Sequence, residues 1–290
     1  MNMLKFCLML ILLLFFFLIF YLQQKSVNTI LIFAPHQDDE AICCTIKMLR
    51  TLKNNGRVYV IYLTDGAPGD ENSQCSWLIS GINVSGTCKE YRLIREKEAK
   101  NAMKMIGVPE ENLIFLRYDD GKLIFSLKDV INNVTFLINK IRPNEIYIPA
   151  YEGGNCDHDA TNYIVYKSIN SLDFKPIVYE YPEYWLNKTQ LVYQKFIPIK
   201  GNHSIVYTKM SEEEKKLKKE IMNNYLSQTH ILINFNKDEI FRILPKYNYS
   251  DPPHERPLYY EPKEYGGYGI CSFTFDDFKF MIDLYEASQH

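Results

Sequence analysis

From residue 29 to residue 179, five short apolar runs alternate with longer segments in which apolar residues recur every three or four positions. The short runs are typical of buried strands, and the longer segments are typical of helices that pack through one face. Strands that alternate with helices are joined by crossover connections and form a parallel sheet. The sequence therefore predicts an α/β fold, a Rossmann-like and mainly parallel sheet with helices on both faces. The predicted strands are residues 29–33, 58–63, 113–116, 146–149 and 176–179, and the predicted helices are residues 41–54, 93–106, 127–141 and 160–169.

Two other regions have a weaker pattern. Residues 68–89 are rich in Gly, Ser, Asn and Asp and are predicted to form a long loop. The C-terminal third contains one charged helix, predicted at residues 212–226, followed by a stretch rich in Pro and Tyr. No boundary is predicted after residue 26, so we expect residues 26–290 to form one domain with a large core.

The N-terminal segment is strongly apolar. Residues 6–22 are seventeen consecutive apolar residues, with Lys5 before them and Lys25 after them. A helix needs about 20 mainly apolar residues to cross a bilayer, and residues 3–22 supply them. A cleaved signal peptide is the alternative, but such peptides end in small residues, whereas this segment ends in bulky ones. We expect residues 1–25 to be a transmembrane anchor, or else a signal segment. The chain is then a single-pass membrane protein whose orientation is open, because one lysine on each side gives little bias.

Charge and motif content exclude several classes of function. The formal net charge is −2, and no basic arm, zinc finger or RNA-binding signature is present, so we expect no nucleic-acid partner. No glycine-rich phosphate loop follows a predicted strand, so a dinucleotide cofactor is not expected. The seven cysteines are irregularly spaced, which does not indicate a disulfide framework. Cys75 and Cys88 flank the predicted loop and can pair if the domain lies outside the cytoplasm.

Polar residues gather where four of the predicted strands end. Ligands bind beyond the carboxyl ends of the strands in open parallel sheets. The clusters that follow the first four strands are residues 35–40, 64–66, 117–121 and 151–159, and the first and last contain both His and Asp. We expect these four clusters to meet at one edge of the sheet.

The first cluster has the composition of half a metal site. One of the adjacent carboxylates, Asp38 and Asp39, can bind a cation beside His36 while the other accepts a proton. A second His, from residues 151–159, would complete three protein ligands and leave a position for water, as in catalytic zinc sites. Such a water has a pKa of about 7 and can attack a carbonyl carbon. The alternative is that both carboxylates cap the following helix and that His36 lies on the surface, although capping and metal binding are compatible.

Residues 34–40, Ala-Pro-His-Gln-Asp-Asp-Glu, resemble the signature of the PIG-L/LmbE-like zinc de-N-acetylases, which include N-acetylglucosaminyl-phosphatidylinositol deacetylase. The resemblance continues in order and spacing over residues 64–66, 95–107, 118–121 and 152–160, and weakly over residues 225–228. It implies the same α/β fold and hydrolysis of an acetyl group from an N-acetylglucosamine-type substrate. The predicted anchor favours a glycolipid or a polysaccharide as that substrate.

The resemblance also implies roles for individual residues. It implies one zinc ion per chain, bound by His36, Asp39 and His158. It implies that Asp38 is the general base, and that Arg95 contacts the substrate.

One position departs from the family pattern. The second motif of the family begins with His, where this chain has Asn155. In relatives that His, oriented by the residue equivalent to Asp157, is thought to stabilise the oxyanion or protonate the leaving amine. Asn donates a hydrogen bond but cannot carry a proton, and the loss of one such electrostatic donor costs about 10²–10³ in rate. Asn155 and Asp157 therefore remain candidate catalytic residues, and either another group substitutes or the enzyme is slow.

Two other functions remain open. A catalytically weakened or inactive family member that binds a metal and acts as a binding protein is the main alternative. The second alternative is a hydrolase that uses the same metal chemistry on another amide or ester. Cys156 is a further candidate ligand, although a packed thiol is the favoured interpretation.

Overall fold

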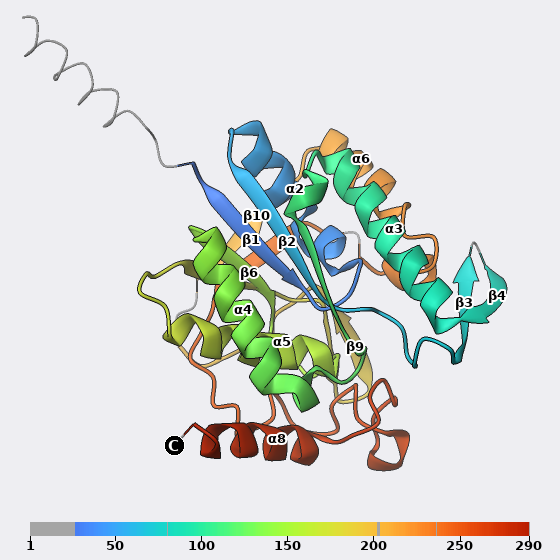
Figure 1. The fold of residues 1–290 in the computed structure, drawn as a ribbon, viewed down its shortest axis with the longest axis vertical. Helices are drawn as coiled ribbons and strands as arrows, with labels where there is room; N and C mark the ends of the chain where they lie inside the picture. Colours follow the sequence, from blue (N-terminus) through green and yellow to red (C-terminus); the bar gives the residue numbers. More distant parts are fainter. Residues whose placement is uncertain (1–26, 80, 202–203, 236, 290) are drawn as a thin grey trace, which may run out of the picture.

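The computed structural model describes residues 27–79, 81–201, 204–235 and 237–289 (Figure 1). The predicted membrane segment, residues 1–25, lies outside the described residues. Among the residues described, no helix is both long enough and apolar enough to span a bilayer.

A seven-stranded sheet occupies the centre of the domain, in the order β10-β11-β7-β6-β1-β2-β5. The five predicted strands are all present and run parallel to one another. Two further strands of the C-terminal third add antiparallel to one edge, and the sequence analysis missed them. The strands are β1 (Thr29–Ala34), β2 (Arg57–Thr64), β5 (Leu113–Tyr118), β6 (Glu145–Pro149), β7 (Ile177–Tyr181), β10 (Ile205–Thr208) and β11 (Glu239–Ile243).

Helices cover both faces of this sheet, as predicted (Figure 1). Alternate residues of β1 enter different cores: Ile30 and Ile32 pack with α2, α3 and α6, whereas Leu31 and Phe33 pack with α4, α5 and α8. A strand buried on both faces in this way has the continuous apolar sequence of a parallel sheet. The long helices are α2 (Asp39–Lys53), α3 (Cys88–Ile106), α4 (Leu127–Ile141), α5 (Cys156–Asn170), α6 (Glu212–Met222) and α8 (Phe275–Ala287). Short helical turns cover Glu110–Asn112, Leu123–Ser126, Thr229–Leu232 (α7) and Lys263–Tyr265.

The prediction of a long loop at residues 68–89 was wrong. This region forms a hairpin of β3 (Gln74–Ile79) and β4 (Ile82–Thr87), and the Cys75–Cys88 disulfide joins its two ends. The Trp77 ring stacks on Tyr91 of α3, with ring centroids 5.0 Å apart. Helix α3 begins earlier than predicted, at the capping box that Thr87 and Glu90 form. A second hairpin consists of β8 (Tyr184–Asn187) and β9 (Gln190–Tyr193).

The strand order creates a crevice between β1 and β6. Starting from β1, the chain adds β2 and β5 on one side, and later adds β6 and β7 on the other. The loop after β1 enters α2 on one face of the sheet, and the loop after β6 enters α5 on the other face. Two adjacent parallel strands whose loops diverge in this way leave an open crevice, the topological switch point where ligands of such sheets bind. The first and last polar clusters of the sequence lie at this point.

Candidate metal centre and active site

The loops after β1 and β6 bring three metal-binding side chains together. The Nδ1 atom of His36 lies 3.3 Å from Nε2 of His158 and 3.5 Å from Oδ2 of Asp39. Nε2 of His158 lies 3.6 Å from Oδ1 of Asp39, and all three residues are buried. Zinc bonds of 2.0–2.1 Å in a tetrahedral site place neighbouring donor atoms about 3.3–3.4 Å apart. The triangle that these three residues form therefore offers the donor types that a zinc ion requires at separations close to these, with His36 and His158 facing different oxygens of the Asp39 carboxylate. Three protein ligands would leave a fourth position for water.

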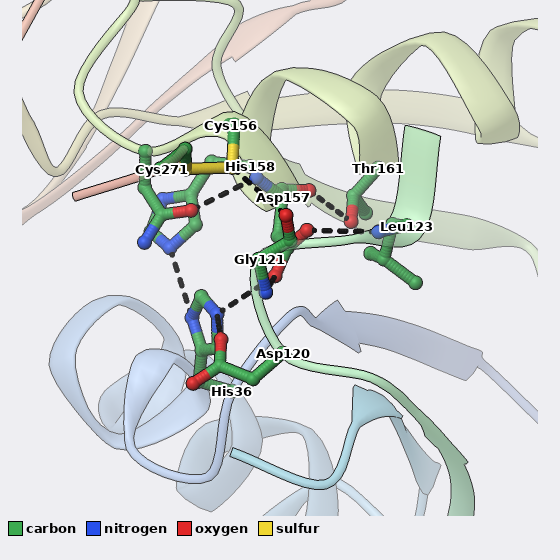
Figure 2. Close-up of a disulfide and its surroundings, with 10 residues drawn as sticks. His36, Asp120, Gly121, Leu123, Cys156, Asp157, His158, Thr161 and Cys271 are labelled. Atoms are coloured by element: carbon green, nitrogen blue, oxygen red, sulfur yellow. Dashed lines mark hydrogen bonds and ion pairs between the residues drawn. A yellow bond between two sulfur atoms is a disulfide. The ribbon is translucent and has the colours of Figure 1, made fainter. Parts of the chain in front are cut away.

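The other ring nitrogen of His36 faces two carboxylates. Nε2 of His36 lies 3.0 Å from Oδ1 of Asp120 and 3.3 Å from Oδ2 of Asp157 (Figure 2). Asp157 is itself fixed, because it accepts hydrogen bonds from the backbone amides of Gly121 (2.6 Å) and Leu123 (3.1 Å). Burial lowers the pKa of His36, but Asp120 and Asp157 outweigh this effect and raise that pKa well above its usual value. Such carboxylates fix the orientation of a metal-binding ring, and here they direct Nδ1 toward the triangle.

Asp38 does not cap α2 with its side chain, so this part of the capping expectation was wrong. Instead, Oδ1 of Asp38 accepts a hydrogen bond of 3.1 Å from Nη2 of Arg95. Arg95 also donates to the carbonyl oxygens of Gln37 and Gly66, each at 3.1 Å. Gly66 has a φ of +68°, and a Cβ added there would lie 2.9 Å from Nη1 of Arg95. The backbone on both sides of the guanidinium therefore holds Arg95 against Asp38.

Asn155 is the N-cap of α5. Its Oδ1 atom accepts a hydrogen bond of 2.8 Å from the backbone amide of Asp157. Asn155 thus hydrogen-bonds the backbone of Asp157 and not its carboxylate. The Asp157 carboxylate faces His36 (Figure 2). Six of the seven candidate site residues line one cavity of about 310 Å³, and Asp157 lies behind His36.

Residues 31–169 match the family model of PIG-L, described as GlcNAc-PI de-N-acetylase. The match spans both metal-binding loops and the helix that carries Arg95. This part of the chain belongs to the PIG-L family. The chain is accordingly an enzyme of the metal-dependent N-deacetylase class.

Solved structures share the PIG-L fold of this chain. The zinc-inhibited form of teicoplanin deacetylase has a TM-score of 0.55 at 14% identity, covering 74% of this chain and 97% of its own. N,N'-diacetylchitobiose deacetylase from Pyrococcus horikoshii has a TM-score of 0.53 at 19% identity, covering 79% of this chain and 85% of its own. Identities this low show the shared fold alone. No curated protein sequence matches the chain.

Two of the three residues in the triangle have charge states that suit metal binding, whereas His36, whose pKa is raised, must release a proton when a metal binds. Burial lowers the pKa of His158 to about 4, although Asp39 opposes this shift, so the ring is neutral near pH 7. Burial alone would raise the pKa of Asp39, but His158 and His36 lower it to about 2. A neutral imidazole and an ionised carboxylate are the forms that bind metals. Burial raises the pKa of Asp38 to about 7, against the opposing effect of Arg95, and such a carboxyl group can accept and return a proton near neutral pH.

The sequence analysis missed part of the cavity wall. Glu183 and Tyr184 directly follow β7, so the rule that led to the other clusters would have found them at the end of the fifth strand. Oε2 of Glu183 lies 3.8 Å from Nδ1 of His158, the ring nitrogen that faces away from the triangle. The C-terminal third supplies further missed residues, for which the sequence has no comparable signal. They include Ile231, Phe235, Ile270, Cys271 and Ser272.

A second disulfide attaches the C-terminal part of this wall to α5. Cys156 bonds to Cys271, next to the turn that carries Asp157 and His158 (Figure 2). The expectations for Cys156, a packed thiol or a fourth metal ligand, were therefore both wrong. Their pairing was not predicted because the two cysteines are far apart in the sequence. Of the cysteines in the described residues, Cys43 and Cys44 are free and buried.

Proposed function

We propose that the chain is a zinc-dependent hydrolase that removes the acetyl group from an N-acetylglucosamine-type substrate. The observation that carries the proposal is the triangle of His36, Asp39 and His158, which lies beside Asp38 in one cavity. Two solved structures that share the fold, teicoplanin deacetylase and N,N'-diacetylchitobiose deacetylase, are deacetylases, which agrees with this reaction class.

The proposed mechanism assigns one task to each residue. His36, Asp39 and His158 would hold one zinc ion, which, when bound, polarises the acetamide carbonyl and lowers the pKa of a water. Asp38 accepts the proton of that water as its oxygen bonds to the acetamide carbon. Asp38 then returns the proton to nitrogen as the carbon–nitrogen bond breaks, which releases acetate and a free amine. Arg95 keeps Asp38 in position through their hydrogen bond and does not need to contact the substrate.

We further propose that residues 1–25 anchor the enzyme in a membrane, with the domain on the oxidising side. Two disulfides, Cys75–Cys88 and Cys156–Cys271, support this orientation, because disulfides persist mainly in oxidising compartments. The anchor would join the domain just before Thr29, the first residue of β1, whereas His36 follows the other end of this strand. Six strand residues span about 20 Å, so the cavity would face away from the bilayer. This placement favours a polysaccharide or an extended glycan over a sugar attached directly to a lipid headgroup.

Metal analysis and acetate release test the proposal together. The full chain in detergent is loaded with zinc and incubated with N-acetylglucosamine, with its oligosaccharides and with an N-acetylated polysaccharide. We expect one zinc per chain, acetate release, loss of activity with a chelator and recovery with added zinc. Bound zinc without acetate release from any of these substrates would refute the proposed reaction and favour the binding-protein alternative.

A further inference from the structure

Asn155 stands where the family pattern has His, and other side chains with hydrogen-bond donors line the same cavity, among them Tyr184, Lys122 and Gln228. Asn155 uses its Oδ1 atom as the N-cap acceptor for Asp157, so its amide nitrogen remains available as a donor. Burial raises the pKa of the Tyr184 phenol well above its usual value, and a side-chain hydrogen bond with Asn155 opposes this shift. A hydrogen bond that lowers the pKa of a phenol is one that the phenolic oxygen accepts, so Asn155 is the donor and the phenolic proton of Tyr184 remains available to a ligand in the cavity.

Several contacts fix the Tyr184 ring at the cavity wall. The backbone amide of Tyr184 donates to Oε1 of Glu152 at 2.9 Å. The ring packs against Gly154, where an added Cβ would lie 2.9 and 3.0 Å from two ring carbons. On the metal side, the centroids of the Tyr184 and His158 rings are 6.0 Å apart. Tyr184 therefore packs against the residue that precedes Asn155 and lies near His158, one corner of the metal triangle.

We propose that Tyr184 is a catalytic residue, which donates a hydrogen bond to the oxyanion formed at the acetamide carbon, and that Asn155 is the residue that positions it. The inference rests on the proposed deacetylase function. When the water oxygen bonds to the acetamide carbon, the carbonyl electron pair moves to oxygen and creates the negative charge. The Tyr184 hydroxyl hydrogen-bonds that charge and keeps its own proton, while Asp38 transfers the proton that the leaving amine requires. A donor that is already fixed in place stabilises this charge without reorganisation.

The matched variants are Tyr184→Phe and Tyr193→Phe, made in the full, zinc-loaded chain. Tyr193 belongs to the same aromatic group, with its ring centroid 6.2 Å from that of Tyr184, but it does not line the cavity. We expect Tyr184→Phe to lower kcat about 10²–10³-fold. We expect KM, zinc content and Tm to stay close to those of the wild type, and Tyr193→Phe to retain wild-type kcat. Wild-type kcat in Tyr184→Phe would overturn the inference, while wild-type acetate release would leave the proposed function intact.

A binding measurement tests Tyr184 without turnover. The probe is the methylphosphonamidate of glucosamine, in which a tetrahedral anionic phosphorus replaces the acetamide carbon, and titration calorimetry measures its affinity. We expect Tyr184→Phe to weaken binding of this probe at least tenfold and to leave the affinity for glucosamine unchanged. Equal affinities of wild type and variant for the probe would overturn the inference, even if no substrate released acetate.

A double-mutant cycle tests the positioning role of Asn155. If Asn155 acts through Tyr184, Asn155→Ala lowers kcat in the wild-type background and has little further effect in the Tyr184→Phe background. If instead the two substitutions lower kcat by factors that multiply in the double variant, Asn155 acts independently of Tyr184. That result would overturn its assignment as the positioning residue.

Discussion

Removing the Cys156–Cys271 disulfide should destabilise the protein more than removing Cys75–Cys88. The two disulfides close loops of very different length, with sequence separations of 115 and 13 residues. In the chain-entropy treatment, a cross-link restricts the unfolded chain more when its loop is longer. The expected loss is about 5 kcal/mol for Cys156–Cys271 and about 3 kcal/mol for Cys75–Cys88.

The comparison uses two double variants, Cys156→Ser with Cys271→Ser and Cys75→Ser with Cys88→Ser. Urea unfolding of each, followed by tryptophan fluorescence, yields the free energy of unfolding. Only the first pair should also alter catalysis, because Cys271 lies between Ile270 and Ser272 of the cavity wall. We expect a higher KM in that variant and a wild-type KM in the other. Equal free energies of unfolding for the two variants, or a destabilised first variant with wild-type KM, would refute this reasoning.

Three further substitutions test the metal centre and its surroundings. Asp38→Asn should leave zinc content near one per chain and lower kcat by about 10²–10⁴-fold, because it removes the proton acceptor but no ligand; a fall in bound zinc would instead make Asp38 a ligand. His158→Ala should lose most of its zinc by elemental analysis, since it removes one corner of the triangle, and unchanged zinc would exclude His158 from the ligand set. Gly66→Ala should lower both kcat and Tm, because the new methyl group would displace the side chains of Gln37 and Arg95 and the positive φ costs about 1–2 kcal/mol; wild-type kcat in this variant would separate the position of Arg95 from catalysis.

The elements that the sequence predicted well are those with a strong local pattern. Helix α4 has the predicted bounds, Leu127–Ile141, because its apolar stripe and the following Pro143 are both local signals. The β3–β4 hairpin was missed because its inward side chains, Cys75 and Trp77, are separated by polar residues typical of loops. Strand β10 was missed because it is a short strand at the edge of the sheet, where most of its residues are exposed.

The same division applies to the site. The residues of the metal triangle were predicted because each lies just after a strand and within a motif, and both signals are short stretches of chain. Its surroundings come from other segments: Asp120 follows β5, Tyr184 follows β7, and Ile270 lies on the C-terminal segment held by a disulfide. Asp120 belongs to a polar cluster that was expected at this edge, although its contact with His36 was not predicted, and Tyr184 and Ile270 were not assigned to the site.

By itself, the sequence determined the parallel α/β architecture and, through a family resemblance, indicated candidate metal-binding residues, because apolar periodicity and strand-end motifs act within a few residues of one another. The tertiary structure alone decided which carboxylates face His36 and which hydroxyl faces Asn155. Those contacts depend on β1 lying beside β6, and β6 beside β7, in the sheet. Strand order is set by the packing of the whole core, so it places residues far apart in the chain at the same edge of the sheet.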